Sequence, residues 1–110
     1  MVTGATGGIG RVIATTLAEL GADLVLVDRP GSSYAPLVVE IERDWRVEVQ
    51  TIDCDLEAEE DRRSLVETIR RIDGGLDVLV NNAAFVGTSD LDGWATDFER
   101  QTVVTWRRAL

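Results

Sequence analysis

One glycine-rich stretch near the N-terminus decides the fold: Thr3-Gly4-Ala5-Thr6-Gly7-Gly8-Ile9-Gly10. It follows a short stub, Met1 to Thr3, and it opens a segment whose apolar residues recur at spacings of three and four, namely Ile9, Ile13, Leu17 and Leu20. This spacing predicts an amphipathic helix, which Gly21 ends. A glycine turn between a strand and a helix presents backbone N–H groups and the positive end of the helix dipole to a pyrophosphate. The same glycines also have a purely structural interpretation, as a tight loop.

Apolar runs and helical patterns alternate along the rest of the chain. Strands are predicted at residues 23–28, 47–52 and 76–80, with helices at about 34–44 and 57–72 and a last helix from about Trp94 to the C-terminus. Such alternation predicts βαβ units and a parallel sheet in a single α/β domain spanning residues 1–110. Both ends of the chain look cut, because the first strand is a stub and no stop residue closes the last helix.

Composition excludes several classes of function. The chain has twenty acidic and eleven basic residues, and its net charge of −9 disfavours binding to nucleic acids and to anionic lipid surfaces. With one cysteine, Cys54, and no histidine, neither a disulfide within the chain nor a metal site is expected. No apolar run approaches the roughly 18 to 20 residues of a membrane span, and no secretory signal is evident, so we expect a cytoplasmic protein.

An acidic residue ends the second predicted strand. Asp28 follows Gly10 by eighteen residues, the position from which a carboxylate accepts hydrogen bonds from the adenosine ribose of a dinucleotide. Its charge repels a 2'-phosphate and therefore favours NAD over NADP, whereas the neighbouring Arg29 would attract that phosphate. In the alternative interpretation, Asp28 only opens a turn before Pro30.

In order and spacing, the glycine pattern, Asp28, Asp55-Leu56 and Asn81-Asn82-Ala83 resemble the short-chain dehydrogenase/reductase family over essentially the whole chain. The resemblance implies a partial Rossmann (doubly wound) fold, with four parallel strands in the order 3-2-1-4 and flanking helices. It also implies that Asp55 accepts a hydrogen bond from the adenine amine and that the Leu56 backbone meets a ring nitrogen. Asp55 is equally suited to cap the helix that follows it.

The resemblance further implies that Asn81-Asn82-Ala83-Ala84 lines the cofactor ribose and steadies the sheet. Ala84 stands where the family usually has glycine, a change that costs about 1 kcal/mol if the position needs a positive φ. Alternatively, the asparagines satisfy backbone groups at a strand end. The predicted cofactor-binding residues are Thr3, Gly4, Thr6, Gly7, Gly8, Ile9, Gly10, Asp28, Arg29, Asp55, Leu56, Asn82, Ala83 and Ala84.

The catalytic residues of that family have no counterpart in this chain. The family uses a tyrosine as acid/base, a lysine four residues later that lowers its pKa, and an upstream serine. The chain contains no lysine, and its only tyrosine, Tyr34, lies too early in the sequence. No catalytic residue is therefore assigned.

The sequence thus predicts the cofactor-binding portion of a longer, homo-oligomeric, NAD(P)-dependent oxidoreductase that acts on an alcohol or carbonyl compound. The alternatives are a non-catalytic dinucleotide-binding module, an inactive remnant, or a domain that holds another nucleotide or an S-adenosyl ligand.

Overall fold

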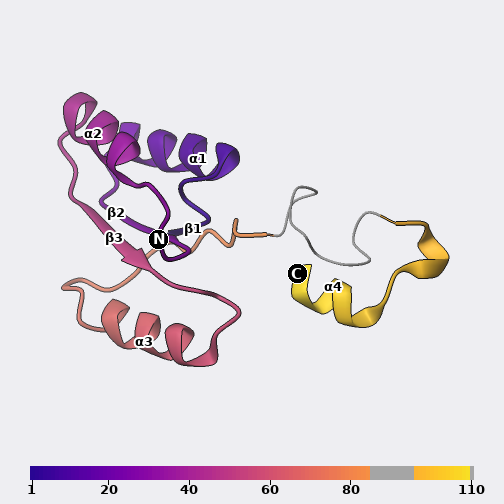
Figure 1. The fold of residues 1–110 in the computed structure, drawn as a ribbon. Helices are drawn as coiled ribbons and strands as arrows, with labels where there is room; N and C mark the ends of the chain where they lie inside the picture. The colour runs from indigo at the N-terminus through magenta and orange to yellow at the C-terminus, as the bar shows by residue number, and fades with distance from the viewer. Residues whose placement is uncertain (85–95, 110) are drawn as a thin grey trace.

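The structure is a computed structural model that describes residues 1–84 and 96–109, and it is built around a three-stranded parallel sheet (Figure 1). The strands β1 (Val2–Thr3), β2 (Leu24–Asp28) and β3 (Val49–Asp53) lie in the order β1-β2-β3. Helices α1 (Gly8–Glu19) and α2 (Ala35–Asp44) cover one face of this sheet, and α3 (Glu59–Ile69) covers the other. The short 3-10 helix η1 (Phe98–Arg100) and α4 (Val103–Ala109) follow. The α/β fold class is confirmed.

Two hydrophobic cores lie on opposite faces of β2. Side chains alternate between the faces of a strand, so a strand that is buried on both faces is apolar at every position. Leu24 and Leu26 pack in one core with Val2, Leu37 and Ile41. The other core contains Val25, Val27, Cys54 and Leu65. The central strand therefore joins both layers and ends at the half-buried Asp28.

Helix α1 packs on the sheet through small residues, and the predicted apolar stripe is only partly correct. Ile13 and Leu17 pack against the first core, but Ile9 and Leu20 are 72% and 78% exposed. The buried positions are Gly10, Ala14 and Ala18. Small side chains allow the close approach of helix and sheet that dense packing requires, so the helix is rotated relative to the face that hydrophobicity alone predicts.

The prediction of a full fourth strand is wrong for the described residues. Segment 76–80 pairs with β1 through a single parallel bridge between Val2 and Val80. Hydrogen bonds run from the Met1 amino group to Val78 O, from Val80 N–H to Met1 O and from Thr3 N–H to Val80 O. Because β1 has only two residues, it offers a short edge for pairing, and Leu76, Val78 and Leu79 stay 38–53% exposed.

The other predicted elements agree with the structure to within a few residues. The predicted helix at 57–72 is shorter at both ends, and Leu65, Ile69 and Ile72 face the second core as expected. Trp94 lies outside the described residues. The single helix predicted from it to the C-terminus is interrupted, because residues 96–109 contain the separate short elements η1 and α4 with non-helical residues 101–102 between them. Among the helices of the described segments, none has the length and apolar character needed to span a membrane.

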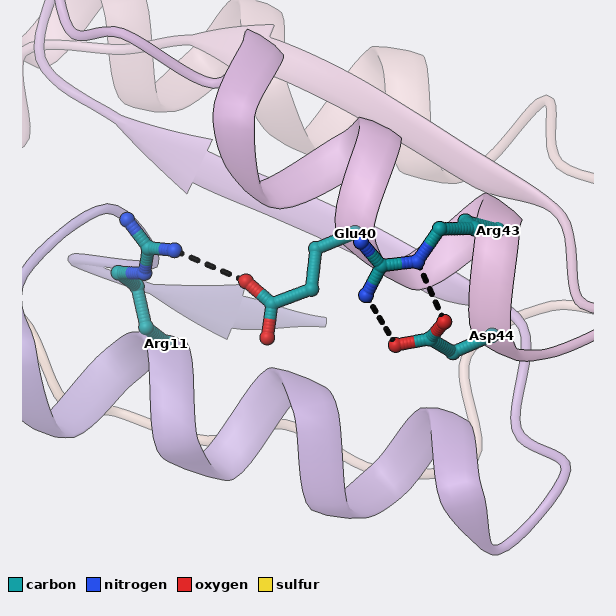
Figure 2. Close-up of polar contacts among 4 residues, drawn as sticks. All are labelled: Arg11, Glu40, Arg43 and Asp44. Atoms are coloured by element: carbon teal, nitrogen blue, oxygen red, sulfur yellow. Dashed lines mark hydrogen bonds and ion pairs between the residues drawn. The ribbon is translucent and has the colours of Figure 1, made fainter.

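An ion pair joins the two helices on the first face of the sheet. Figure 2 shows Arg11 of α1 reaching Glu40 of α2, with 3.0 Å between the guanidinium nitrogen and the carboxylate oxygen. The second pair in this view, Arg43 with Asp44, lies within α2. Partly exposed pairs of this kind contribute about 0–1 kcal/mol, so the packing of α1 against α2 depends mainly on their apolar residues.

Candidate functional site

The turn after β1 requires glycine at two positions for steric reasons. Gly4 has a φ of +62°, and a Cβ atom there would lie 2.9 Å from Ala83 Cα. A Cβ atom on Gly10 would overlap the carbonyl oxygen of Gly4 and lie 2.9 Å from Ala5 Cα. These two glycines bring the first turn of α1 against the end of β1.

Side-chain hydrogen bonds hold this turn against the segment that follows Val80. The Thr3 hydroxyl donates to Val80 O at 3.2 Å and accepts from the N–H groups of Asn82 and Ala83, both at 3.0 Å. Asn82 Nδ2 donates to Thr3 O and Gly4 O at 3.0 and 3.1 Å. Asn82 therefore satisfies backbone groups at the strand ends, as the structural interpretation predicts. No described residue other than glycine has a positive φ, so Ala84 is accommodated without that strain.

The N-terminal end of α1 is open. Its N-cap is Gly7, no side chain caps it, and the residues at its tip, Gly7, Gly8 and Ile9, are exposed. A Cβ atom on Gly8 would meet nothing within 4 Å. The first N–H groups of a helix have no acceptor within the helix. An uncapped and unobstructed end of this kind suits an anionic group such as a pyrophosphate.

Asp28 lies beside this turn and is already bonded to it. Its Oδ2 accepts hydrogen bonds from the N–H and the hydroxyl of Thr6, both at 2.8 Å, and its Oδ1 accepts from the Arg29 N–H at 2.9 Å. Partial burial by itself would raise the pKa of Asp28, but hydrogen bonds from Thr6, Arg29 and Ser32 outweigh it and hold the pKa below its ordinary value. Asp28 is therefore a carboxylate at neutral pH. The coupling to Thr6 was not predicted from the sequence.

Asp55 and Leu56 follow β3 and line the same edge of the sheet. Asp55 Oδ1 accepts from the Glu57 N–H at 2.9 Å, which makes a turn before the helix. The N-cap of α3 is Ala58, with no side-chain hydrogen bond, so the alternative role of Asp55 as its N-cap is wrong. The Leu56 side chain packs against the second core, and its carbonyl oxygen accepts a hydrogen bond from the Arg62 guanidinium at 2.6 Å. The backbone N–H is therefore the part of Leu56 suited to contact a ligand.

Tyr34 spans the ends of two strands, a role that the sequence analysis missed. Its hydroxyl lies 2.9 Å from Ile52 O and 3.3 Å from Asp28 O, and a phenol donates to such carbonyls. Burial, together with the charges of Asp53 and Asp28, raises the pKa of Tyr34 to about 12. A catalytic tyrosine of the kind described above needs a lowered pKa, so this environment suits a structural role.

The whole chain matches one known protein family. The family described as short chain dehydrogenase matches residues 1–110. The chain belongs to this family. The short-chain dehydrogenase relatives include a farnesol dehydrogenase from Aedes aegypti, 34% identical over 84% of the chain and 38% of the relative. Another is a 3-oxoacyl-(acyl-carrier-protein) reductase from Aquifex aeolicus, 32% identical over the whole chain and 42% of the relative.

Solved structures of short-chain dehydrogenases share the fold. A metagenomic short-chain oxidoreductase in complex with NADP aligns with a TM-score of 0.78 at 30% identity, and the alignment covers 98% of this chain and 46% of that one. The chain spans about two fifths of the length of the curated relatives it matches.

The predicted residues of this short-chain dehydrogenase chain gather at one edge of the sheet. The glycine turn and Asp55-Leu56 follow the carboxyl ends of β1 and β3, Asp28 is the last residue of β2, and Asn82-Ala83 lies against the turn. In open α/β sheets, this edge is where ligands bind. Within residues 1–84 and 96–109, no cluster of three or more metal-ligating side chains occurs.

Proposed function

We propose that this chain is the dinucleotide-binding portion of an oxidoreductase that exchanges hydride between a nicotinamide cofactor and an alcohol or carbonyl substrate. The observation that supports it best is the open N-terminal end of α1 beside the Asp28 carboxylate, on a turn whose glycines admit no side chain at two positions. Family membership supports the reaction class, and the NADP complex of the metagenomic relative supports the cofactor class.

In this proposal each residue group has a separate task. The pyrophosphate would lie over Gly7, Gly8 and Ile9, where helix N–H groups and the helix dipole favour negative charge. Thr3 and Asn82 would keep the turn in shape, with Gly4 and Gly10 in close contact. Asp55 and the Leu56 backbone would contact the adenine, and Ala83 and Ala84 would border the ribose near the nicotinamide. When bound, the nicotinamide supplies the hydride chemistry.

We further propose that NAD is preferred over NADP. The Asp28 side chain keeps its negative charge because hydrogen bonds lower its pKa. A charged carboxylate accepts hydrogen bonds from ribose hydroxyls and repels a 2'-phosphate. The positively charged Arg29 next to it would attract the 2'-phosphate of NADP and so reduce this preference. The NADP-bound relative does not decide the preference of this chain, because relatives within one fold differ at the residues that contact the ligand.

Three features of the whole protein belong to the same proposal. The acid/base residues would lie outside this chain, which contains no lysine. Homo-oligomeric assembly and a cytoplasmic location stay predictions. A non-catalytic dinucleotide-binding module remains the alternative.

Calorimetric titration of the protein that carries this chain with NAD, NADP, ADP and S-adenosylmethionine tests the proposal. We expect NAD to bind most tightly, and we expect Gly8→Asp to abolish binding because it places a carboxylate where the pyrophosphate would lie. Binding of S-adenosylmethionine in preference to NAD would contradict the proposed cofactor class. Binding of NAD without turnover of any alcohol or ketone would favour the non-catalytic module.

A further inference from the structure

Tyr34 connects the two strand ends from which the adenosine site would be built. It precedes α2, and its ring packs against the first core. From there its hydroxyl reaches Ile52 O of β3 at 2.9 Å and Asp28 O of β2 at 3.3 Å. The backbones of β2 and β3 are already paired at this level, where Asp28 lies opposite Asp53 and the Cys54 N–H donates to Asp28 O at 2.8 Å. The Tyr34 side chain therefore reinforces the pairing of β2 and β3 where both strands end.

The surroundings of Tyr34 keep it a hydrogen-bond donor. Burial and the nearby carboxylates of Asp53 and Asp28 raise the pKa of Tyr34 to about 12, so the hydroxyl is protonated throughout the physiological range. A protonated phenol has one hydrogen to donate, and here the acceptors around it are the carbonyls of the two strands and the side chain of Asp53. The link between the strands does not vary with pH near neutrality.

We propose that Tyr34 is a positioning residue for the adenosine half of the cofactor. Its single hydroxyl hydrogen is shared between carbonyl oxygens at the ends of β2 and β3, which reinforces the paired strand ends and helps to hold Asp28 in place relative to Asp55 and Leu56. This inference rests on the function proposed above. Groups that contact one ligand from separate strands bind it best when their spacing is set before the ligand arrives, since less ordering is then required on binding. Tyr34 itself need not touch the cofactor.

Tyr34→Phe tests this role, because it removes the hydroxyl and retains the ring in the core. AMP and nicotinamide mononucleotide, the two halves of NAD, serve as probes together with NAD itself. We expect the affinity of the protein that carries this chain for AMP and NAD to fall about threefold to tenfold, the range of a single lost hydrogen bond. The affinity for nicotinamide mononucleotide should not change.

Ile69→Val is the matched control, because Ile69 packs on the second core from α3 and makes none of the Tyr34 contacts. Both substitutions are expected to lower stability by a similar, modest amount, and affinities are measured well below the unfolding temperature of each variant. Weakened binding of AMP in Tyr34→Phe alone supports the inference. Equal loss of AMP binding in Ile69→Val, or equal loss for both halves of NAD, overturns it.

The failure of this inference differs from a failure of the proposed function. If the original protein binds neither NAD nor AMP, both are overturned. If the original protein binds NAD and AMP and Tyr34→Phe binds them equally well, only the positioning role of Tyr34 is overturned.

Discussion

Gly10→Ala should destabilise the protein far more than Gly8→Ala, although the two glycines share the first turn of α1. A Cβ atom on Gly10 would overlap Gly4 O and would lie 2.9 Å from both Ala5 Cα and Asn82 Nδ2. Two of these atoms belong to the backbone and cannot rotate away. Overpacking typically costs about 1–3 kcal/mol, and contact with backbone places this case near about 3 kcal/mol. The protein that carries this chain is expected to be about two and a half times as long, as its relatives are, and for that size about 3 kcal/mol corresponds to a fall in Tm of roughly 6 to 12 °C.

Gly8 provides the control, because a Cβ atom there would meet nothing within 4 Å. Gly8→Ala should leave stability unchanged or raise it by up to about 1 kcal/mol, since alanine favours a helix over glycine. Gly8→Asp should also fold well, because a carboxylate near a helix N-terminus contributes about 0.3–1 kcal/mol. The same carboxylate would repel a pyrophosphate. The three variants therefore separate the packing role of the turn from its proposed binding role.

The assay combines thermal unfolding, followed by circular dichroism, with calorimetric titration of NAD on the protein that carries this chain. Gly10→Ala should melt at a much lower temperature, whereas Gly8→Asp should melt near the original temperature and fail to bind NAD. A Tm for Gly10→Ala within about 2 °C of the original would refute the packing argument. NAD binding by Gly8→Asp as tight as that of the original would refute the placement of the pyrophosphate.

Four further predictions concern Asp28, Asn82 and the chain expressed alone. Asp28→Ala should narrow or reverse the preference for NAD over NADP, measured as the ratio of the two kcat/KM values, and an original protein that already prefers NADP would contradict the role of Asp28. Because the pKa of Asp28 is lowered on folding, its stabilising effect is present above the pKa of the unfolded chain and is lost as the pH falls below about 4. Asp28→Asn should therefore lose less stability than the original between pH 7 and pH 3, as followed by urea unfolding. Asn82→Ala removes the two hydrogen bonds to Thr3 O and Gly4 O and should lower the free energy of unfolding by about 1–3 kcal/mol. A variant with the same Tm as the original protein would contradict this prediction. Residues 1–110 expressed alone should show no turnover with NAD and an alcohol, and should self-associate through the exposed apolar residues Leu76, Val78 and Leu79; a monodisperse monomer in analytical ultracentrifugation would contradict the second expectation.

Periodicity predicts the existence of most helices and strands in this chain, because each central element carries its own pattern. The alternation into two cores makes β2 apolar at four successive positions, and Leu37 and Ile41 mark the inner face of α2. The orientation of α1 was less predictable. Hydrophobicity predicts that Ile9 and Leu20 are buried, but both are exposed. The buried residues are Gly10, Ala14 and Ala18, because only small side chains fit at the short distance between helix and sheet.

The fourth strand shows a different limit of sequence patterns. The segment 76–80 has the composition of a buried strand, but a strand forms only as far as a neighbour offers hydrogen-bonding groups. Here that neighbour is the two-residue β1, so pairing stops at one bridge. The composition of a segment indicates whether it favours a strand, and the length of the adjacent strand determines how many of its residues can pair.

The positions of the candidate site residues were predictable, whereas their bonds to one another were not. Gly4, Asp28 and Asp55 follow strand ends, and parallel strands bring their carboxyl ends to one edge. The bond from Thr6 to Asp28 joins residues 22 apart in sequence, and the bonds from Asn82 to Thr3 and Gly4 join residues more than 70 apart. Such pairings depend on tertiary structure, for which a single sequence contains no direct pattern.

These bonds share one consequence for binding. Asn82 ties the segment after Val80 to the glycine turn, Thr6 ties the turn to Asp28, and Tyr34 ties β2 to β3. The edge that would contact a dinucleotide is therefore connected from one strand to the next by side chains, before any ligand is present. Because these side chains order the edge during folding, less ordering is required when a ligand binds. A substitution that breaks one of the links, such as Thr6→Val between the turn and Asp28, should therefore weaken NAD binding.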